Sequence, residues 1–155
     1  MFLLLFPVVN LGFAGGGTGW FSDYHFRAIR SSGNFNPVSG VLSSDPTRSQ
    51  DYAELRRMAR DRGYPDIDTM IAKEANLPDG FTALTVVGRN DMHSPAGIAA
   101  FNAGKHVFME KPIAENWQQA QDLMAAYKAS GKAAVVSYTY TGDPMVKLGR
   151  KLIQG

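Results

Sequence analysis

The stretch that decides the fold is Val8-Val-Asn-Leu-Gly-Phe-Ala-Gly-Gly-Gly-Thr-Gly19. Its first half is an apolar run with the length of one buried strand, and its second half is a run of glycines that leads into a segment able to form a helix. Glycine lacks a Cβ atom, so the backbone can turn sharply and approach a ligand closely. A strand, a glycine turn and a helix in this order suit a dinucleotide's pyrophosphate, because the helix start presents unpaired N–H groups and a positive dipole end.

Within the turn, Gly15 and Gly17 take the first two positions of the pattern G-x-G-x-x-G, whereas Trp20 stands at the third. We expect cofactor contacts from Gly15, Gly17, Thr18, Gly19 and Trp20, and we expect the indole to crowd the pyrophosphate. Taken alone, a glycine run is weak evidence, since any tight turn from strand to helix can use one. Its place after the first strand strengthens the interpretation.

Apolar runs that fit fully buried strands recur along the chain, at residues 8–14, 37–42, 83–87, 106–109 and 133–138. Segments with helical periodicity lie between them, so strands and helices alternate. The clearest helix is predicted at 117–130, with Gly131 as its stop. This alternation predicts a doubly wound α/β fold, in which helices cover both faces of a parallel sheet.

Other helix starts are marked by capping residues and prolines. Asp45 and Pro46 predict an N-cap followed by a proline at the first helical position, and Pro95 is expected near the start of another helix. The segment 68–75 is predicted as a short helix, and 77–80 as a turn.

Length and composition fit one globular domain. The chain has 155 residues, of which 45% are hydrophobic and 19% charged, with a formal net charge of +2. The chain contains no cysteine, which excludes disulfides and thiolate metal sites, and we predict no metal site. The local arginine cluster is predicted to be the solvated face of one helix rather than a nucleic-acid surface, and it comprises Arg56, Arg57, Arg60 and Arg62.

The apolar N-terminus resembles a targeting segment only superficially. It lacks a basic region and a cleavage site of small residues, and Pro7 and Asn10 interrupt it well short of the ~18 apolar residues of a membrane helix. We expect a cytoplasmic protein without membrane contact, with a degenerate export signal as the alternative. Residues 1–6 receive no role.

The second predicted strand ends roughly 25 residues after the glycine turn, where a Rossmann fingerprint would place the adenosine ribose. An NAD-selective site usually has a carboxylate there, but this chain has Ser43 and Ser44, with Arg48 just beyond. Two hydroxyls and a guanidinium suit a 2′-phosphate, so NADP is expected in preference to NAD. The alternative is that Ser44 or Asp45 only caps the next helix.

Residues 86–114 read V-V-G-R-N-D-M-H-S-P-A-G-I-A-A-F-N-A-G-K-H-V-F-M-E-K-P-I-A. This stretch resembles the Gfo/Idh/MocA family of NAD(P)-dependent sugar and polyol oxidoreductases. In that family a strand ends in T-P-N-x-x-H, a helix of the type A-I-x-A-L-x-A-G-K-H-V follows, and the next strand ends in E-K-P. The resemblance extends from about residue 11 to the end of the chain. It implies a Rossmann domain that binds a nicotinamide dinucleotide in an enzyme oxidising a hydroxyl group.

The resemblance assigns roles to residues at the predicted strand ends. Glu110, Lys111 and Pro112 are expected at the cofactor, with Lys111 beside the nicotinamide, where its ammonium would stabilise an alkoxide and a lowered pKa would let it carry the catalytic proton-transfer role. The alternative is a surface lysine in a loop. Asn90 and His93 match the polar pair near the cofactor, although His93 could instead begin a helix.

The sequence departs from the family pattern at two positions, and it has two further histidines. Gly88 and Arg89 replace the family's Thr-Pro, so the loop facing the cofactor loses a rigid element and gains a charge. His25 and His106 are predicted to be structural.

Members of this family continue into a second α/β domain, which forms the substrate wall, carries a D-x-x-x-H pattern and usually makes the oligomer interface. Residues 1–155 show no counterpart to it. We therefore expect the Rossmann domain of an oxidoreductase for a small hydroxylated substrate, able to bind nucleotide without turnover and to oligomerise only with the second domain. A stand-alone NAD(P)-binding module and a degenerate relative that binds no cofactor are the alternatives. In the domain alone, Lys111 should be accessible to solvent.

Overall fold

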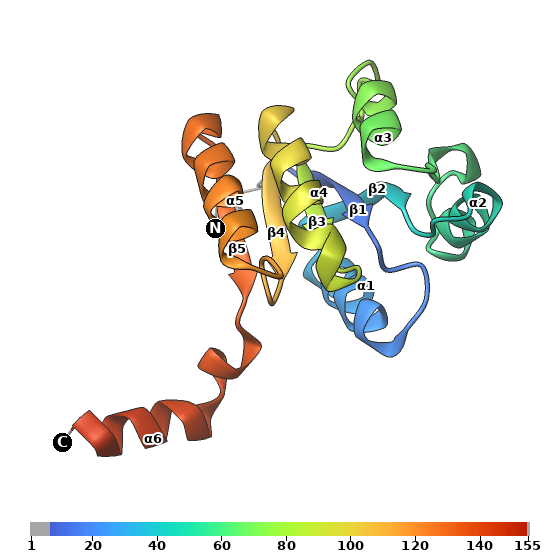
Figure 1. Ribbon diagram of the computed structural model, residues 1–155. Helices are drawn as coiled ribbons and strands as arrows, with labels where there is room; N and C mark the ends of the chain where they lie inside the picture. Colours follow the sequence, from blue (N-terminus) through green and yellow to red (C-terminus); the bar gives the residue numbers. More distant parts are fainter. Residues whose placement is uncertain (1–6, 155) are drawn as a thin grey trace.

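The computed structural model describes residues 7–154, which form a sheet with helices on both faces (Figure 1). Five parallel strands form the sheet in the order β2-β1-β3-β4-β5. The strands are β1 (Val9–Ala14), β2 (Phe35–Val41), β3 (Ala83–Val86), β4 (His106–Glu110) and β5 (Ala134–Ser137). Each predicted strand is present, so the parallel α/β fold is confirmed. The apolar residues 1–6, to which the sequence assigned no role, lie outside the described residues.

Helices connect the strands. They are α1 (Trp20–Ser32), α2 (Pro46–Leu55), α3 (Ile67–Glu74), α4 (Asn90–Asn102), α5 (Trp117–Ser130) and α6 (Pro144–Gln154), with short 3-10 turns η1 (Arg60–Arg62) and η2 (Thr139–Gly142). Figure 1 shows α4 and α5 together on one face of the sheet, α1 on the other, and α6 extending away from the sheet. Within residues 7–154, no helix has both the length and the apolar character needed to cross a membrane.

Local capping explains where several helices begin and end. Asp45 caps α2 by accepting a hydrogen bond from the Arg48 backbone N–H at 2.8 Å, and Pro46 follows at the first helical position, as predicted. Asn116 caps α5 by accepting from the Gln119 N–H at 3.0 Å. Gly131 ends α5 in the left-handed region with φ of 64°, which confirms the predicted helix and its stop.

Apolar side chains fill both sides of the sheet. On the α1 side, the Phe13 and Phe26 rings stack with centroids 4.3 Å apart, and both side chains are buried. On the α4 and α5 side, Leu84 and Val86 of β3 pack in one cluster with Leu123. Because β1 and β3 carry core residues on both faces, packing on both sides fixes the positions of these two strand ends.

The pairing of β1, the second strand in the sheet, decides where a ligand can bind. It pairs with β2 through Val9 and Phe35, and on its other edge with β3 through Leu11 and Ala83. The chain therefore leaves β1 in one direction along the sheet and later resumes on the opposite side. The loops after β1 and β3 therefore lead to opposite faces of the sheet, and ligands bind in the crevice between them at the carboxyl ends of the strands.

The start of α4 differs from the prediction. The helix begins at Asn90, so Pro95 lies inside it rather than in its first turn, and His93 does not begin it. The residue before the helix, Arg89, makes no side-chain capping hydrogen bond. The sequence therefore lacks the usual start signal at this point, and the proline indicated a later start.

The arginine cluster is also arranged differently from the prediction. Helix α2 ends at Leu55, so the four arginines follow it and do not share one helix face. Arg56 pairs with Asp23 of α1, Arg60 with Asp51, and Arg62 with Glu74. The prediction of a solvated helix face is wrong, because carboxylates from neighbouring elements pair with three of the four cations.

Glu74 anchors the segment between α2 and β3. Its carboxylate is fully buried and accepts hydrogen bonds from the Arg62 Nε at 2.9 Å and from the Tyr64 hydroxyl at 2.8 Å. Burial, and then the bond to Glu74, raise the pKa of the Tyr64 phenol well above its ordinary value. The Tyr64 N–H also donates to the Gly40 carbonyl at 2.8 Å, which ties this segment to the edge of the sheet beside β2.

Candidate functional site

A cavity of about 900 Å³ opens at the carboxyl ends of β1, β2 and β3. Five short segments line it, namely residues 14–18, 41–44, 48 and 52, 65–67, and 87–96 in part. Its position is that of the crevice expected from the strand order, and its volume is within the range of small-molecule and cofactor sites, about 300–1,000 Å³.

The glycine turn forms the central wall of this cavity. Gly15 and Gly16 have φ values of 84° and 87°, a region that favours glycine. A Cβ atom on Gly15 would lie 2.3 Å from the Gly88 Cα, and one on Gly17 would lie 2.3 Å from the Leu42 carbonyl oxygen. The turn therefore packs backbone against backbone with the loops after β3 and β2, and only glycine fits these two positions.

Helix α1 begins at the end of this turn without a side-chain cap. Gly19 is its N-cap residue, with φ of 116°. The first N–H groups of α1 therefore lack a side-chain acceptor, which suits an anionic group at the cavity. Thr18 lines the cavity, whereas Gly19 and Trp20 do not. Trp20 is 72% exposed, and the rings of Phe21 and Tyr24 lie edge-on to its ring.

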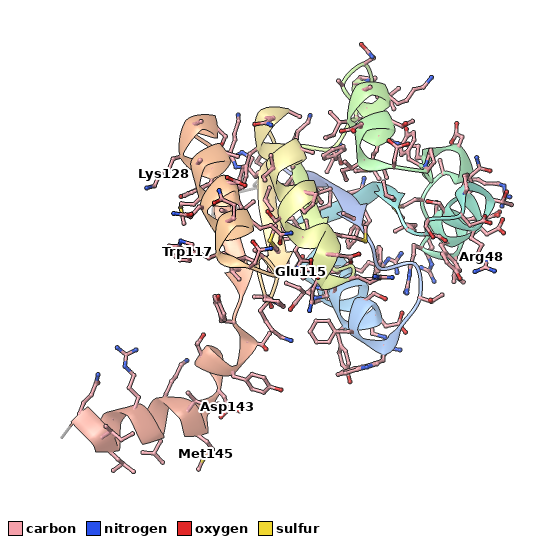
Figure 2. All side chains as sticks on the ribbon, viewed as in Figure 1. Arg48, Glu115, Trp117, Lys128, Asp143 and Met145 are labelled. Carbon is pink, nitrogen blue, oxygen red and sulfur yellow. The ribbon has the colours of Figure 1, made fainter. Side chains whose placement is uncertain are left out.

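The three residues predicted for the ribose end, Ser43, Ser44 and Arg48, all line the cavity. Ser43 accepts a hydrogen bond from the Asp45 N–H at 3.1 Å, so Ser43 and Asp45 supply the local capping contacts and Ser44 does not. Figure 2 shows the Arg48 side chain on α2. Among residues 7–154, no carboxylate lies within ion-pairing distance of this guanidinium.

Part of the cavity wall was not predicted from the sequence. Pro65, Asp66 and Ile67 line it, together with Tyr52 of α2. Asp66 caps α3 and accepts from the Thr69 N–H at 2.7 Å and from its hydroxyl at 2.9 Å, bonds that lower the pKa of the Asp66 carboxyl. In the sequence, Asp66 is recognisable only as a possible cap of the next helix. Its place at the cavity depends on long-range packing, which has no local signal.

The loop after β3 forms the opposite wall, where the sequence has Gly88 and Arg89. The Arg89 guanidinium lies in a fork with the Asp91 carboxylate, with Nε to Oδ1 at 3.2 Å and Nη2 to Oδ2 at 3.1 Å. Both residues line the cavity. The Arg89 side chain is 84% exposed, so solvent surrounds the pair.

His93 joins two loops instead of lining the cavity. Its ring is buried, with Nε2 3.1 Å from the Gly88 carbonyl oxygen and Nδ1 2.5 Å from the Pro112 carbonyl oxygen. A neutral imidazole donates through one of these nitrogens, and the tautomer decides which. The ring therefore connects the loop after β3 with the loop that carries Lys111.

Lys111 follows β4 at the same edge of the sheet as the glycine turn, and its side chain is exposed, as expected for this domain alone. The buried carboxylate of Glu110 lies 2.9 Å from the His25 Nε2 and accepts from the Lys111 backbone N–H at 3.3 Å. Asn90 is exposed at the start of α4. None of five predicted residues lines the cavity: Asn90 and His93 stand on α4 after β3, and Glu110, Lys111 and Pro112 stand at the end of β4, one strand further.

The two remaining histidines make contacts inside the fold. His25 reaches Glu110 as described, and its ring lies edge-on to Phe108. The His106 Nδ1 accepts from the Ala133 N–H at 3.0 Å, which connects β4 to the residue before β5.

Curated relatives match most of this chain. An uncharacterised oxidoreductase of Bacillus subtilis is 30% identical over 131 residues, which cover 84% of this chain and 33% of the relative. A scyllo-inositol 2-dehydrogenase (NADP(+)) of the same organism is 29% identical over 84% of this chain and 38% of its own length. The chain therefore spans only about a third of these relatives.

Solved structures agree with this match. An oxidoreductase from Sinorhizobium meliloti superposes with a TM-score of 0.86 at 30% identity, over 96% of this chain and 41% of that one. An inositol dehydrogenase homologue from Azotobacter vinelandii, complexed with NAD+, gives 0.84 at 29% identity, over 96% and 38%. The profile described as "Oxidoreductase family, NAD-binding Rossmann fold" matches residues 10–138. This chain belongs to the Gfo/Idh/MocA oxidoreductase family and contains its NAD-binding Rossmann fold.

Proposed function

We propose that this chain binds a nicotinamide dinucleotide in the cavity beside β1 and forms the cofactor-binding part of an oxidoreductase acting on a hydroxyl group of a sugar or polyol. The observation that carries the proposal is the cradle at Gly15 and Gly17, where a Cβ atom would meet backbone at 2.3 Å. Such a cradle, followed by an uncapped helix start, fits a pyrophosphate. Relatives named as inositol dehydrogenases support the class of substrate.

Other residues of the chain bind the rest of the cofactor, transfer the proton and position the lysine. Ser43 and Ser44 hold the adenosine ribose, and the Gly88 loop directs the other half of the cofactor toward the end of β4. The bound nicotinamide supplies the hydride acceptor. Lys111 lies beside the reacting carbon, where its neutral amine accepts the proton that leaves the hydroxyl, and the ammonium so formed stabilises the negative charge developing on the substrate oxygen. His93 positions the Lys111 loop through the Pro112 carbonyl.

NADP is the preferred cofactor in this proposal, because an NAD-selective site has a carboxylate where this chain has Ser43, Ser44 and Arg48, whose guanidinium has no ion pair within residues 7–154. We expect Arg48→Gln to weaken NADPH binding by about tenfold and to leave NADH binding unchanged, because only NADPH carries the 2′-phosphate. Calorimetric titration of the 155-residue chain measures both affinities. Tighter binding of NADH than of NADPH by the wild-type chain would refute the preference.

We further propose that these 155 residues act as one nucleotide-binding domain that needs a second domain for turnover. Lys111 is exposed here, and general-base work requires a lysine whose ammonium is partly desolvated. The chain should therefore bind NADPH but produce none from NADP+ and myo-inositol, as followed by NADPH absorbance. Oxidation of inositol that persists in Lys111→Ala would contradict both the domain proposal and the role of Lys111.

A further inference from the structure

We propose that Arg89 is a switchable phosphate-binding residue: it exchanges its ion pair with Asp91 for the cofactor's diphosphate. This inference rests on the proposed function, because it needs a dinucleotide in the cavity. It gives a role to the charge that replaces the family's proline.

The location of Arg89 supports this role. It follows Gly88, whose Cα would lie 2.3 Å from a Cβ atom on Gly15, so the two loops are in backbone contact. Both Arg89 and the residues of the glycine turn line the same cavity. A diphosphate seated on the turn is therefore within the span of a long side chain from the facing loop.

The present partner of Arg89 holds it weakly. The pair with Asp91 has separations of 3.1 and 3.2 Å and is formed by residues 84% and 47% exposed, so water screens it. A guanidinium presents a fork of donors that matches two phosphate oxygens as well as it matches a carboxylate. In the exchange, the Arg89 guanidinium gives up its two contacts with the Asp91 carboxylate and makes two with the diphosphate, which carries more negative charge.

No other charged side chain on the described wall of the cavity serves the diphosphate. Arg48 lies at the ribose end beside Ser44, and the Asp66 carboxylate is occupied by Thr69. While Arg89 is paired with Asp91, the glycine turn offers N–H groups only. Asp91 therefore lowers the affinity for the cofactor by holding Arg89, and Arg89 raises that affinity when it is released.

The two arginines should affect the two cofactors differently. The diphosphate is common to NADH and NADPH, so Arg89 should act on both, whereas Arg48 should act on NADPH alone. This difference separates a diphosphate contact from a contact with the 2′-phosphate.

The test is titration of the 155-residue chain with NADH and with NADPH at low salt. We expect Arg89→Gln to weaken both by about tenfold, the loss typical of one charge-assisted hydrogen bond. We expect Asp91→Asn to tighten both by about threefold, because it frees the guanidinium without removing it. Arg150→Gln, which removes the same charge from an exposed position on α6, should change neither.

The outcomes separate the two proposals. A wild-type chain that is folded but binds neither dinucleotide overturns the proposed function and this inference with it. A wild-type chain that binds, with affinities unchanged in Arg89→Gln and Asp91→Asn, overturns the inference alone. A loss confined to NADPH in Arg89→Gln also overturns it, because the contact would then be to the 2′-phosphate.

Discussion

Gly15→Ala should abolish measurable binding of NADH and NADPH, with a loss of at least about a hundredfold. The new Cβ atom would lie 2.3 Å from the Gly88 Cα and 2.5 Å from its nitrogen, and φ of 84° is strained for alanine. Both atoms in conflict are backbone, so a side-chain rotation cannot relieve the contact. The loops after β1 and β3 must separate at the point where the diphosphate would lie. Fluorescence titration of the folded variant measures the loss.

Gly131→Ala is the matched control for this variant. Gly131 also has a positive φ, of 64°, but a Cβ atom there meets nothing within 4 Å, and the residue ends α5. The control should lose about 1 kcal/mol of stability and keep its cofactor affinity. If Gly15→Ala folds and binds NADH within tenfold of the wild type, the cradle does not hold the diphosphate.

Glu74→Leu should lower the free energy of unfolding by about 3–5 kcal/mol, because it removes the buried carboxylate of the Arg62 pair and leaves Arg62 only the exposed Asp79 carboxylate, 2.7 Å from Nη1. The Glu74 side chain is 0% exposed and that of Arg62 is 13% exposed, so water replaces little of the lost carboxylate, and Asp79 contacts only the outer side of the guanidinium, at 60% exposure. The bonds to Glu74 are also what chiefly raises the pKa of Arg62. The Tyr64 hydroxyl loses its acceptor in the same variant. Urea denaturation followed by circular dichroism gives the difference.

Two further variants serve as controls for Glu74→Leu. Glu115→Leu changes an exposed carboxylate, so it should alter stability by less than about 0.5 kcal/mol. The double variant Arg62→Met with Glu74→Leu should regain part of the loss, since both buried charges are then removed. A loss below about 1 kcal/mol in Glu74→Leu would show that the segment from η1 to α3 does not depend on this ion pair.

The sequence predicted those parts of the molecule that are encoded locally. Strand bounds follow from short apolar runs, and the caps at Asp45 and Gly131 follow from the residue types present. The glycine turn was predictable for the same reason, since its two constrained positions admit no side chain.

Long-range packing decided what the sequence did not predict. The wall at Pro65 and Asp66 depends on the buried Glu74 and on the bridge between Gly40 and Gly63, and none of these contacts has a local signature. His93 carries a motif position, yet its ring turns to the carbonyls of Gly88 and Pro112 and away from the cavity. Residue type and spacing gave its place along the chain but not its contacts.

The pairing of β1 also sets a delay during synthesis. One edge of β1 finds its partner as soon as β2 leaves the ribosome, but Leu11 on the other edge pairs with Ala83, about 70 residues later. At translation rates of about 5–20 residues per second, that edge stays open for roughly 4–14 seconds. Until β3 is made, the backbone N–H and C=O groups on that edge of β1 have no strand partner. Chaperone capture of this chain should therefore concentrate on nascent lengths at which β2 has emerged and β3 has not.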